Sequence, residues 1–487
     1  MNTIKNKLPI EFKDEMKELL GIEYDDFIAS YDHPKTTAIR INTIKNSIDD
    51  FLKLSLFSID PCINKIEWSE EGFYISLEEN PGKNPLHDAG SYYIQEPSAM
   101  SVVGETEIRE NERILDMCAA PGGKSTYILS KLNNTGLLVS NEIDKTRVKA
   151  LGDNLERFGA INSIITNTSS DKLLEVFEGY FDKVFIDAPC SGQGMFRKDE
   201  YAIEDWSISK VDECVSIQKQ LIRDGYKMLK NKGILIYSTC TFTKRENEDI
   251  IKDFLDDCEG ARLISMDRKW PHKTKGEGHF CSRIEKQSLQ DGEIIEVTTP
   301  KPKKKNKKST KTGINILNNE EKNLFHDFLG KHIKAGCEFM KKCSEMKVIK
   351  KDNLVYLIND VDRDLSKLRI MRNGICIGEM KKNRFEPSHS LAMALKTKEV
   401  NNYINLKYDS SSIKKYISGD VIDLINIDES DIISISINGY SDTENIKSND
   451  LKSSWVLVLI EGVSIGWSKE SRGILKNKYP KGLRRYI

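Results

Sequence analysis

The sequence predicts an α/β protein whose largest part is a parallel sheet covered by helices on both faces. Between about residues 100 and 285, short apolar runs alternate with stretches of helical periodicity. Strands that alternate with helices form parallel sheets, because the helix returns the chain to the same edge of the sheet. The chain has 487 residues, which exceeds the size at which one core keeps growing, so two to four domains are expected. A doubly wound core with flanking domains follows.

Composition excludes several classes of protein. With 38% hydrophobic and 31% charged residues, the chain is typical of a globular protein, and no run approaches the roughly 20 apolar residues of a membrane span. The first residues lack a secretory signal, so we expect a cytoplasmic protein without a membrane partner. Ten cysteines without a CxxC pair indicate reduced thiols and no metal site. A net charge of -1 leaves nucleic-acid binding open, because the distribution of charge decides it.

Residues 1–99 are predicted to form a small α+β leading domain. It contains a helical stretch over 11–20 and an alternating, strand-like run over 36–43. It ends in the segment 87–100, which is rich in aromatic and small residues. Its residues Gly90, Tyr92, Tyr93 and Gln95 either cover the pocket of the next domain or form an aromatic packing seam.

Residues 100–285 are predicted to form the core domain. In order, we expect a strand ending at Asp116, a helix after Gly122, a strand ending at Glu142, a helix from Asp144, a strand over 163–167, a strand ending at Asp187, a long helix over 211–229 and a strand ending at Cys240.

Three further segments follow the core domain. Residues 286–315 are polar and are interpreted as a linker, whose run over 301–311 has seven lysines in eleven residues; it is a solvated tether or an RNA-contacting one. Residues 316–398 are predicted to form a middle domain, with a helix over 318–333 and a hairpin around Asn373-Gly374 followed by a helix. Residues 399–487 contain short strands and are predicted to form a compact β-rich module.

The segment ILDMCAAPGGK, residues 114–124, is predicted to be a cofactor loop. Its small residues let a ligand approach the backbone closely. It lacks the spacing of phosphate-binding loops, which favours a phosphate-free adenosyl ligand. The next strand ends at Glu142, where a carboxylate can accept hydrogen bonds from ribose hydroxyls. Asp144 competes for that role, and either acid alone is often a helix cap.

Two cysteines follow strand-like runs, in DAPCSG and STCT. A single buried cysteine is usually a small hydrophobic residue, but Cys190 and Cys240 together suit a covalent mechanism with separate attacking and releasing groups. An attacking thiol must be shifted towards thiolate by nearby positive groups. Asp187 ends an apolar run and therefore needs a partner, and small residues beyond Pro189 leave room for a planar base.

These motifs resemble those of the Nol1/Nop2/Sun family of RNA 5-methylcytosine methyltransferases. The likeness rests on CAAPGGK (118–124), DAPCSG (187–192) and STCT (238–241), in the family's order. It extends to GSYYIQEPSAM and to the tail, where RFEPSHSLAMAL and NKYPKGLR are similar to the bacterial RsmF type, which acts on small-subunit ribosomal RNA. The resemblance implies a Rossmann-like methyltransferase core that uses S-adenosylmethionine, and a PUA-like RNA-binding module at the end of the chain.

The resemblance also implies roles for individual residues. Cys240 would add to carbon 6 of cytosine, Cys190 would help remove the proton from carbon 5, Asp187 would hold the nitrogen edge of the ring, and Lys124 would place a charge near the base. The cofactor would be held by Cys118, Ala119, Ala120, Pro121, Gly122, Gly123, Lys124, Glu142, Arg147, Asp171 and Asp187. The family usually places an acid after the third strand to contact adenine; here Ser169 and Ser170 precede Asp171, which we choose.

The resemblance implies an RNA partner, 16S ribosomal RNA or the small ribosomal subunit, bound by a monomer. A cytosine must be single-stranded or flipped out to react, so the flanking domains are expected to grip RNA. The basic residues predicted to do so are Arg40, Arg384, Lys481, Arg484 and Arg485. The alternatives are transfer RNA as substrate, a non-catalytic ribosome-assembly factor, and a DNA cytosine methyltransferase. The last is disfavoured by the Thr-Cys motif, because in such enzymes the cysteine of Pro-Cys attacks.

Overall fold

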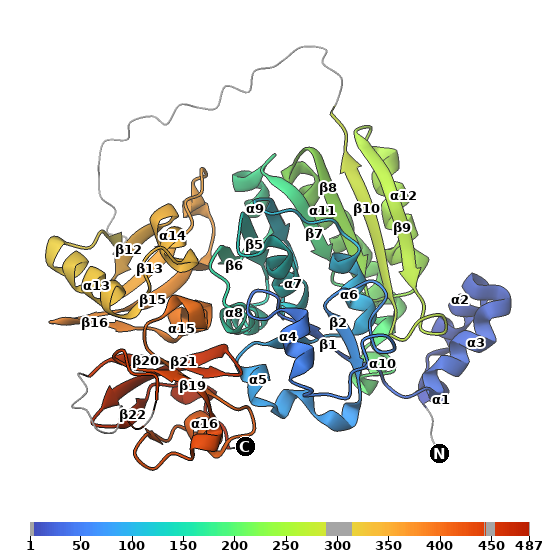
Figure 1. Cartoon of the computed structure of the whole chain (residues 1–487). Helices are drawn as coiled ribbons and strands as arrows, with labels where there is room; N and C mark the ends of the chain where they lie inside the picture. The colour runs from blue at the N-terminus through green and yellow to red at the C-terminus, as the bar shows by residue number, and fades with distance from the viewer. Residues whose placement is uncertain (1–3, 289–313, 443, 445–452, 487) are drawn as a thin grey trace, which may run out of the picture.

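The computed structural model describes residues 4–288, 314–442, 444 and 453–486. Its centre is an eight-stranded sheet of order β14-β6-β5-β4-β7-β8-β10-β9 (Figure 1). Five adjacent strands are parallel: β4 (Arg113–Asp116), β5 (Leu137–Asn141), β6 (Ser163–Thr166), β7 (Phe181–Asp187) and β8 (Leu229–Thr239). The antiparallel strands β10 (His279–Lys286) and β9 (Ala261–Lys269) extend one edge. The predicted α/β core is confirmed.

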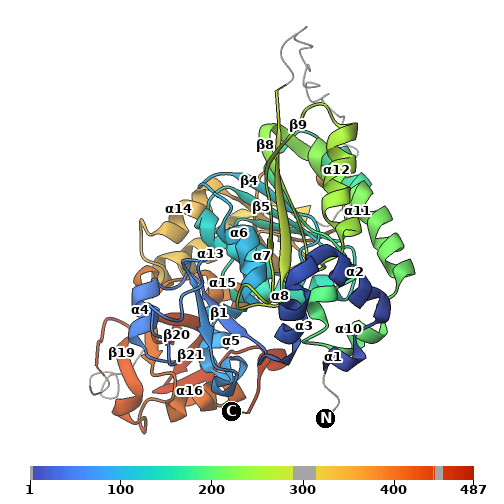
Figure 2. The same cartoon turned by 90° about the vertical axis from the view of Figure 1, so that its right-hand side faces the viewer.

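Helices cover both faces of this sheet (Figure 2). One face carries α6 (Pro97–Gly104), α7 (Gly123–Leu132) and α8 (Arg147–Arg157); the other carries α9 (Ser170–Phe177), α11 (Ile208–Met228) and α12 (Glu248–Asp257). Successive strand residues alternate between the two cores, so that Ile114 packs on the α7 side and Leu115 on the α11 side. The carboxyl ends of the parallel strands meet at one edge, which gathers the loops after β4, β5, β7 and β8.

The predicted hairpin around Asn373-Gly374 is wrong. Strand β14 (Ile370–Asn373) pairs with β6 of the central sheet, whereas β15 (Ile375–Lys381) pairs with β13 (Leu354–Ile358) and β16 (Arg384–Pro387). The chain thus passes between two sheets at Gly374, whose φ is 64°. An added Cβ there would lie 1.9 Å from the carbonyl oxygen of Leu357. The Asn-Gly pair indicated the positive φ correctly, but it carries no information on which strands pair.

The leading residues form two parts. Helices α1 (Ile4–Lys7), α2 (Ile10–Leu20) and α3 (Tyr24–Ala29) pack on the central domain and its short α10 (Glu200–Glu204), at the side of the molecule away from the C-terminal sheets (Figure 1). Their aromatic rings lie against those of the loops after β7 and β8. The ring centres of Phe12 and Phe196 are 5.1 Å apart, and those of Phe27 and Phe242 are 5.3 Å apart.

The second leading part is a three-stranded antiparallel sheet. Strand β1 (Thr37–Ile41) lies between β2 (Gly72–Ile75) and β3 (Tyr92–Ile94), with α4 (Ile48–Lys53) and α5 (Pro85–Asp88) beside them. Tyr92 is buried and its hydroxyl donates to the carbonyl of Pro81, 2.6 Å away. The aromatic segment before α6 therefore contributes a packing seam.

Arg40 of β1 does not contact RNA as expected; that prediction is wrong. Its side chain is 0% exposed. The guanidinium donates to Gln95 Oε1 at 3.0 Å, to the carbonyl of Gly123 at 3.1 Å and to Thr126 Oγ1 at 2.7 Å. It also lies 4.3 Å from the centre of the Tyr127 ring. Both faces of β1 are covered, so a basic residue in an alternating run is buried here, where it joins β1 to the start of α7.

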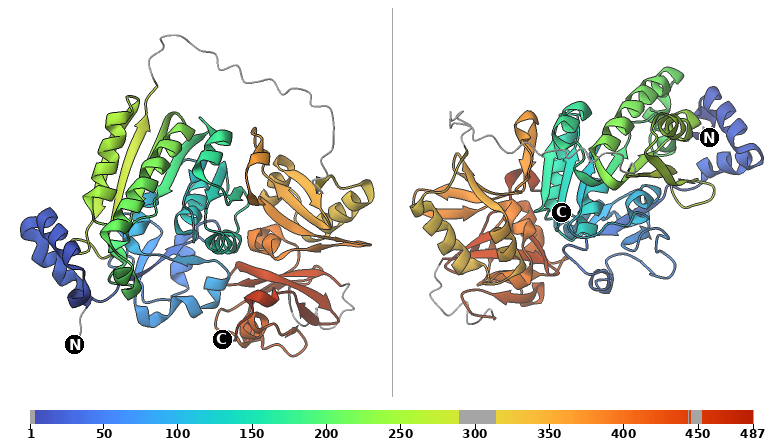
Figure 3. Two further views of the ribbon diagram at one scale, coloured as in Figure 1. Left: turned by 180° about the vertical axis from the view of Figure 1, so that it is seen from behind. Right: turned by 90° about the horizontal axis from the view of Figure 1, so that it is seen from above.

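The C-terminal region contains two further sheets that lie next to each other at one end of the molecule (Figure 3). The first has five strands, including β11 (Ile314–Asn315) and β12 (Lys347–Lys351), with α13 (Asn319–His332), α14 (Glu338–Glu345) and α15 (His389–Ala394). The predicted helix after residue 374 is therefore present as α15. The lysine run at 301–311 lies outside the described residues.

The last sheet has six strands in the order β18-β22-β21-β20-β17-β19, and it confirms the predicted β-rich end of the chain. They are β17 (Tyr403–Leu406), β18 (Ile422–Asp423), β19 (Ile432–Ser436), β20 (Trp455–Ile460), β21 (Val463–Ser471) and β22 (Ile474–Asn477), with α16 (Ser411–Ser418). Arg485 pairs with Asp88 of α5 at 2.6 Å, which joins the tail to the leading sheet. In the described part of the chain, every helix is too short or too polar to cross a membrane.

Candidate active site

The two motif cysteines lie side by side at the carboxyl edge of the central sheet. Asp187 pairs with Ser238 in the parallel β7/β8 register, so the residues just beyond each strand end meet. Cys190 Sγ and Cys240 Sγ are 3.4 Å apart, and both cysteines are free and partly buried. The hydrogen bond with the Cys240 thiol, together with burial, raises the pKa of Cys190 well above its usual value. Cys190 is therefore held as a thiol beside Cys240.

An ion pair between a buried lysine and a partly exposed aspartate lies next to the thiols. Lys124 Nζ, at the start of α7, is 2.8 Å from Asp187 Oδ2, and Ser238 Oγ donates to Asp187 Oδ1 at 3.1 Å. Burial alone would lower the pKa of Lys124, but the Asp187 carboxylate outweighs it and the pKa is raised. Burial would likewise raise the pKa of Asp187, but the Lys124 charge outweighs it and the pKa is lowered. Both groups stay ionised, and the Lys124 charge also acts on Cys240.

His279 belongs to this cluster and was not singled out from the sequence. It begins β10, and its Nε2 lies 3.7 Å from Asp187 Oδ1, too far for a hydrogen bond. That buried nitrogen has no hydrogen-bond partner among the described residues. Burial lowers the pKa of His279 to about 4, so the ring is neutral at pH 7. No local motif marks this histidine, because only the antiparallel pairing of β10 with β8 brings it to the site.

The dipeptide Glu246-Asn247, just beyond Cys240, holds both cysteine loops. Glu246 Oε2 accepts from the amide of Ser191 at 3.0 Å, next to Cys190. Asn247 Oδ1 accepts from Thr239 Oγ1 at 2.6 Å, and its Nδ2 donates to the carbonyl of Thr241 at 3.0 Å, on either side of Cys240. Both side chains are fully buried. These bonds tie the two loops to one short segment.

The loops also touch each other directly. The amide of Gly194 donates to the carbonyl of Cys240 at 2.8 Å, and the hydroxyls of Ser191 and Thr241 are 2.9 Å apart. A Cβ on Gly194 would lie 2.7 Å from the Cys240 oxygen, so a glycine is needed for this approach. The separation of the two sulfurs is therefore set by backbone contacts.

The loop after β4, residues 117–122, is held by hydrogen bonds from α8. Arg147 Nη2 donates to the carbonyl of Ala120 at 2.6 Å, and Asn154 Nδ2 donates to that of Pro121 at 2.8 Å. The amide of Ala119 donates to the carbonyl of Asn141 at 2.8 Å. Gly122 has a φ of 114° and begins α7 as its N-cap, so the first amides of α7 follow a loop with few side chains. Cys118 lies at the start of this loop, and burial raises its pKa.

Two buried carboxylates border this loop, and each has one oxygen that accepts no hydrogen bond from a described residue. Glu142 Oε2 has no hydrogen-bond partner among the described residues, although Arg147 Nη1 lies 3.5 Å away. Asp144 instead accepts from the amides of Thr146 and Arg147, both at 2.7 Å, so it acts as a cap at the start of α8. Asp116 Oδ1 is also unpaired, and burial raises the pKa of Asp116 to about 7.

Asp171 lies on the first turn of α9 and is exposed. A hydrogen bond with Ser169 lowers its pKa. The residue that contacts the Glu142 segment is Asn167, whose Nδ2 donates to the carbonyls of Glu142 at 2.7 Å and Ile143 at 2.8 Å. Asn167 was not singled out from the sequence, and the contact of Asp171 with adenine stays a prediction.

The remaining basic residues predicted to bind RNA differ in their surroundings. Arg384 is exposed and pairs with Glu386 at 2.8 Å. Lys481 is exposed, whereas Arg484 donates to the carbonyl of Tyr479 at 3.1 Å. Arg485 is committed to its ion pair with Asp88.

A Rossmann-like core with a small-residue loop after its first strand and two thiols at its edge defines a methyltransferase. Family models match most of the chain: the 16S rRNA methyltransferase RsmB/F model at residues 105–293, the N-terminal domain of 16S rRNA methyltransferase RsmF at 8–97, the first C-terminal domain of RsmF at 334–395 and the RsmF PUA domain at 403–485. The chain is 32% identical over 433 residues to ribosomal RNA small subunit methyltransferase F of Vibrio vulnificus, covering 83% of this chain and 88% of the relative. The chain belongs to the RsmF family.

Other relatives agree over a longer span. The protein of the same name from Erwinia tasmaniensis is 28% identical, covering 98% of this chain and 96% of its own length. Among solved structures, a methyltransferase homolog protein from Pyrococcus horikoshii is 27% identical with a TM-score of 0.50, and it covers 59% of this chain and 99% of its own. The structure of NSun6 from Pyrococcus horikoshii has 20% identity and a TM-score of 0.51, over 58% of this chain and 99% of that one, which shows the shared fold.

Proposed function

We propose that this protein transfers a methyl group from S-adenosylmethionine to carbon 5 of a cytosine in small-subunit ribosomal RNA, through a covalent bond between Cys240 and carbon 6. The observation that carries the proposal is the 3.4 Å separation of the Cys190 and Cys240 sulfurs beside the Lys124–Asp187 ion pair. Two thiols and a carboxylate at one edge supply a nucleophile, a base and a group that binds the ring.

The residues around the β4 loop fit the proposed cofactor. Ribose hydroxyls and an ammonium group are donors, and the unpaired oxygens of Glu142 and Asp116 are buried acceptors that need donors. The loop over 118–123 lets the ligand reach the backbone, Arg147 holds the loop, and we expect Asp171, on the first turn of α9, to contact adenine. When bound, S-adenosylmethionine supplies an electrophilic methyl group on its sulfonium.

The chemistry of the chain's own residues then follows. Cys240 adds to carbon 6 as a thiolate, with the Lys124 ammonium beside it. The Asp187 carboxylate accepts a hydrogen bond from the amino group at the nitrogen edge of the ring, and the neighbouring Lys124 ammonium stabilises the electron density that builds up as carbon 5 becomes nucleophilic. After methyl transfer, the Cys190 thiol loses its own proton to a water molecule, and the resulting thiolate takes the proton from carbon 5. The electron pair of that C–H bond re-forms the double bond and expels Cys240 as a thiolate, which restores the enzyme.

The RNA substrate is supported by family membership and by the match of residues 403–485 to the RsmF PUA domain. Transfer RNA is less favoured, because the relatives' names specify small-subunit ribosomal RNA. A non-catalytic assembly factor would not need Cys190, Cys240, Asp187 and Lys124 in one cluster. With the ribosome as substrate, we place the protein in the cytoplasm, and we expect a monomer.

The test is bisulfite sequencing of 16S rRNA from cells that have the protein, from cells that lack it, and from deleted cells that express Cys240→Ala. We expect one or more cytosines to be protected from conversion only where the intact protein is present. Protection that persists in the deleted cells would overturn the proposal, and protection of a transfer RNA instead would reassign the substrate.

A further inference from the structure

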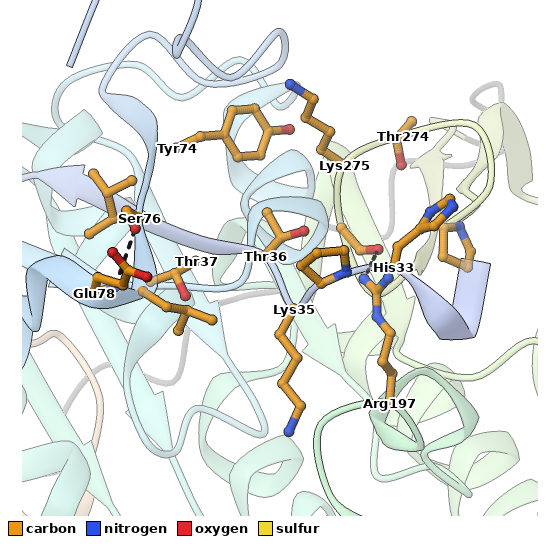
Figure 4. A pocket seen from close by; sticks show the side chains of 15 residues that line it. His33, Lys35, Thr36, Thr37, Tyr74, Ser76, Glu78, Arg197, Thr274 and Lys275 are labelled. Atoms are coloured by element: carbon orange, nitrogen blue, oxygen red, sulfur yellow. Dashed lines mark hydrogen bonds between the residues drawn. The ribbon is translucent and has the colours of Figure 1, made fainter. Parts of the chain in front are cut away.

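A pocket of about 530 Å³ lies between the leading sheet and the loop that joins β9 to β10 (Figure 4). Its lining comes from the segment before β1, from β2 and the residues after it, and from residues 271–276. The side chains that matter below are those of His33, Lys35, Tyr74, Arg197 and Lys275. None of them belongs to the cluster of thiols and carboxylates described above.

Arg197 connects the pocket to the active site. Its Nε donates to Glu277 Oε2 at 2.6 Å, its Nη2 to the carbonyl of Gly276 at 2.9 Å and its Nη1 to the carbonyl of Ser30 at 3.0 Å. Arg197 lies in the loop that contains Cys190, and Glu277 precedes His279 by two residues. The pocket wall and the catalytic loops are thus parts of one hydrogen-bonded unit, and Glu277 neutralises the charge of Arg197.

The charges of the two pocket lysines are not neutralised by a described acidic residue. Lys35 and Lys275 are exposed, and neither forms an ion pair with any described residue. Their neighbours differ in this respect, because Lys273 pairs with Glu23 at 2.8 Å and Lys7 with Glu200 at 2.6 Å. Within the described part of the chain, the one hydrogen bond from Lys35 goes to the carbonyl of Lys198, at 3.2 Å.

An aromatic ring lies beside these charges. Lys275 Nζ is 5.7 Å from the centre of the Tyr74 ring, and Tyr74 is partly buried. Figure 4 shows Lys275 next to Tyr74, Lys35 extending from the other side of the pocket, and Glu78 beside Ser76, on the side away from Thr274. Unpaired lysines near an accessible ring match a nucleotide, since lysines bind phosphate and every base has a face that stacks on an aromatic side chain.

We propose that this pocket binds a nucleotide of the RNA strand that flanks the target cytosine, with its phosphate between Lys35 and Lys275 and its base against Tyr74. The proposal rests on the proposed function, since it assigns part of the substrate to this pocket. It gives the leading sheet a role in holding the strand while the target base lies at the thiols. The hydrogen bonds of the Arg197 side chain fix the pocket wall relative to the catalytic loops.

The experiment measures binding of a fluorescein-labelled, single-stranded RNA that carries the mapped cytosine, by anisotropy at several salt concentrations. For the full-length double variant Lys35→Ala/Lys275→Ala we expect about tenfold weaker binding. The slope of log affinity against log salt concentration should fall in magnitude by about 0.7, because one phosphate contact is lost. Tyr74→Ala should weaken binding about tenfold, and Tyr74→Phe should bind like the wild type, because the ring stacks and the hydroxyl does not. Both lysines are exposed, so the double variant should keep its thermal stability.

Lys252→Ala is the matched control, because Lys252 is an exposed lysine on α12. The KM for RNA should rise in the pocket variants, while kcat at saturating RNA stays near the wild-type value. Unchanged binding and salt dependence in the double variant would overturn the proposal. So would a loss that appears with assembled subunits but not with free RNA, because the pocket would then contact protein. Failure of the proposed function is distinct: the wild type would then transfer no methyl group, whatever the pocket variants bind.

Discussion

At the scale of single residues, the position of the two sulfurs depends on buried groups that do not react. Glu246 is 0% exposed and accepts hydrogen bonds from the amide of Ser191 and from Gln218 Nε2, at 3.0 and 2.8 Å. Gln218 also donates to the carbonyl of Pro189 at 2.9 Å. The Cys190 loop is therefore held by a carboxylate that follows Cys240 in the sequence.

Replacing Glu246 by alanine leaves a buried amide without an acceptor, which costs about 1–3 kcal/mol. For Glu246→Ala we expect a lower kcat with an unchanged dissociation constant for S-adenosylmethionine, because the cofactor residues are not touched. Glu246→Gln keeps one acceptor and should recover most of kcat. Steady-state kinetics and calorimetric titration of the cofactor measure both. Equal kcat in Glu246→Ala and the wild type would show that the loop does not need this carboxylate.

The Lys124–Asp187 pair gives a prediction about stability. Lys124 is only 7% exposed, so Asp187→Asn leaves a buried ammonium without its carboxylate. Because the Asp187 side chain is itself 36% exposed, the free energy of unfolding should fall by less than the roughly 3–5 kcal/mol of a fully buried pair. Lys124→Met in the same chain removes the unpaired charge, and the double variant should be more stable than Asp187→Asn alone. Urea unfolding followed by fluorescence compares the three proteins. A double variant less stable than Asp187→Asn would contradict the view that Asp187 compensates the buried charge of Lys124.

The sequence alone predicted the site residues that follow parallel strands, because each of these residues lies in a motif at the end of a predicted strand. Cys190, Cys240 and Asp187 are of this kind. The sequence did not predict His279, because only the antiparallel pairing of β10 with β8 brings this residue to the site. It predicted Arg40 to be exposed to RNA, because an alternating pattern cannot show that both faces of β1 are covered. The sequence favoured Glu142 over Asp144 for ribose binding, and the hydrogen bonds at the start of α8 show that Asp144 is a helix cap.

At the scale of elements, β14 gives the central sheet a strand from the C-terminal region. The amide of Asn167 donates to the carbonyl of Arg369 at 2.9 Å, and the amide of Arg369 donates to Thr168 Oγ1 at 3.1 Å. The loop after β6, next to the Glu142 segment, is therefore held in place from the C-terminal side. A sequence pattern predicts strands from local periodicity, and it assigned β14 to a hairpin because the pairing partner lies about 200 residues earlier.

Gly374→Ala tests this connection. A Cβ would meet the Leu357 oxygen at 1.9 Å on a residue with a φ of 64°, so both the clash and the left-handed conformation cost free energy, together about 2–5 kcal/mol. The affinity for S-adenosylmethionine should fall as well, because the β6 loop loosens. Urea unfolding and cofactor titration measure the two effects.

Gly179→Ala is the control for the conformation alone. Gly179 has a φ of 60° and nothing within 4 Å of an added Cβ, so only about 1–2 kcal/mol should be lost, without a change in cofactor affinity. If both variants lost the same stability, the close contact at Gly374 would be unimportant.

At the scale of the whole molecule, the catalytic sheet, the leading sheet and the C-terminal sheets share buried surfaces. One hydrophobic core contains Ile39 and Tyr92 of the leading sheet together with Tyr416 of α16 and Ile465 of β21. The predicted order of segments along the chain says nothing of such contacts, because they join residues more than 300 positions apart. We expect the described parts to unfold together.

Buried histidines in two of these parts make the whole fold sensitive to acid. Burial lowers the pKa of both His279 and His332 to about 4, below the value of about 6.5 in an unfolded chain. The unfolded state therefore binds more protons between pH 6.5 and 4, and each histidine removes up to about 3 kcal/mol of stability as the pH falls through that range. Asp116, with its pKa raised to about 7, acts in the opposite direction.

His332→Gln isolates one of these contributions. Its free energy of unfolding should fall less steeply than that of the wild type between pH 6.5 and 4, whereas His33→Gln, at an exposed histidine, should follow the wild type. Urea unfolding at pH 7, 6, 5 and 4.5 measures the slopes. Parallel slopes for His332→Gln and the wild type would exclude His332 as a source of acid sensitivity.

The most direct test of the two-thiol mechanism is to incubate Cys190→Ala with substrate RNA and S-adenosylmethionine and to examine the product by denaturing electrophoresis and peptide mass spectrometry. We predict a protein–RNA complex that survives denaturation, with the methylated pyrimidine attached to the peptide that contains Cys240, because the proton on carbon 5 is not removed. Cys190→Ala/Cys240→Ala should form no complex. Normal turnover by Cys190→Ala, or attachment at another residue, would contradict the assigned roles.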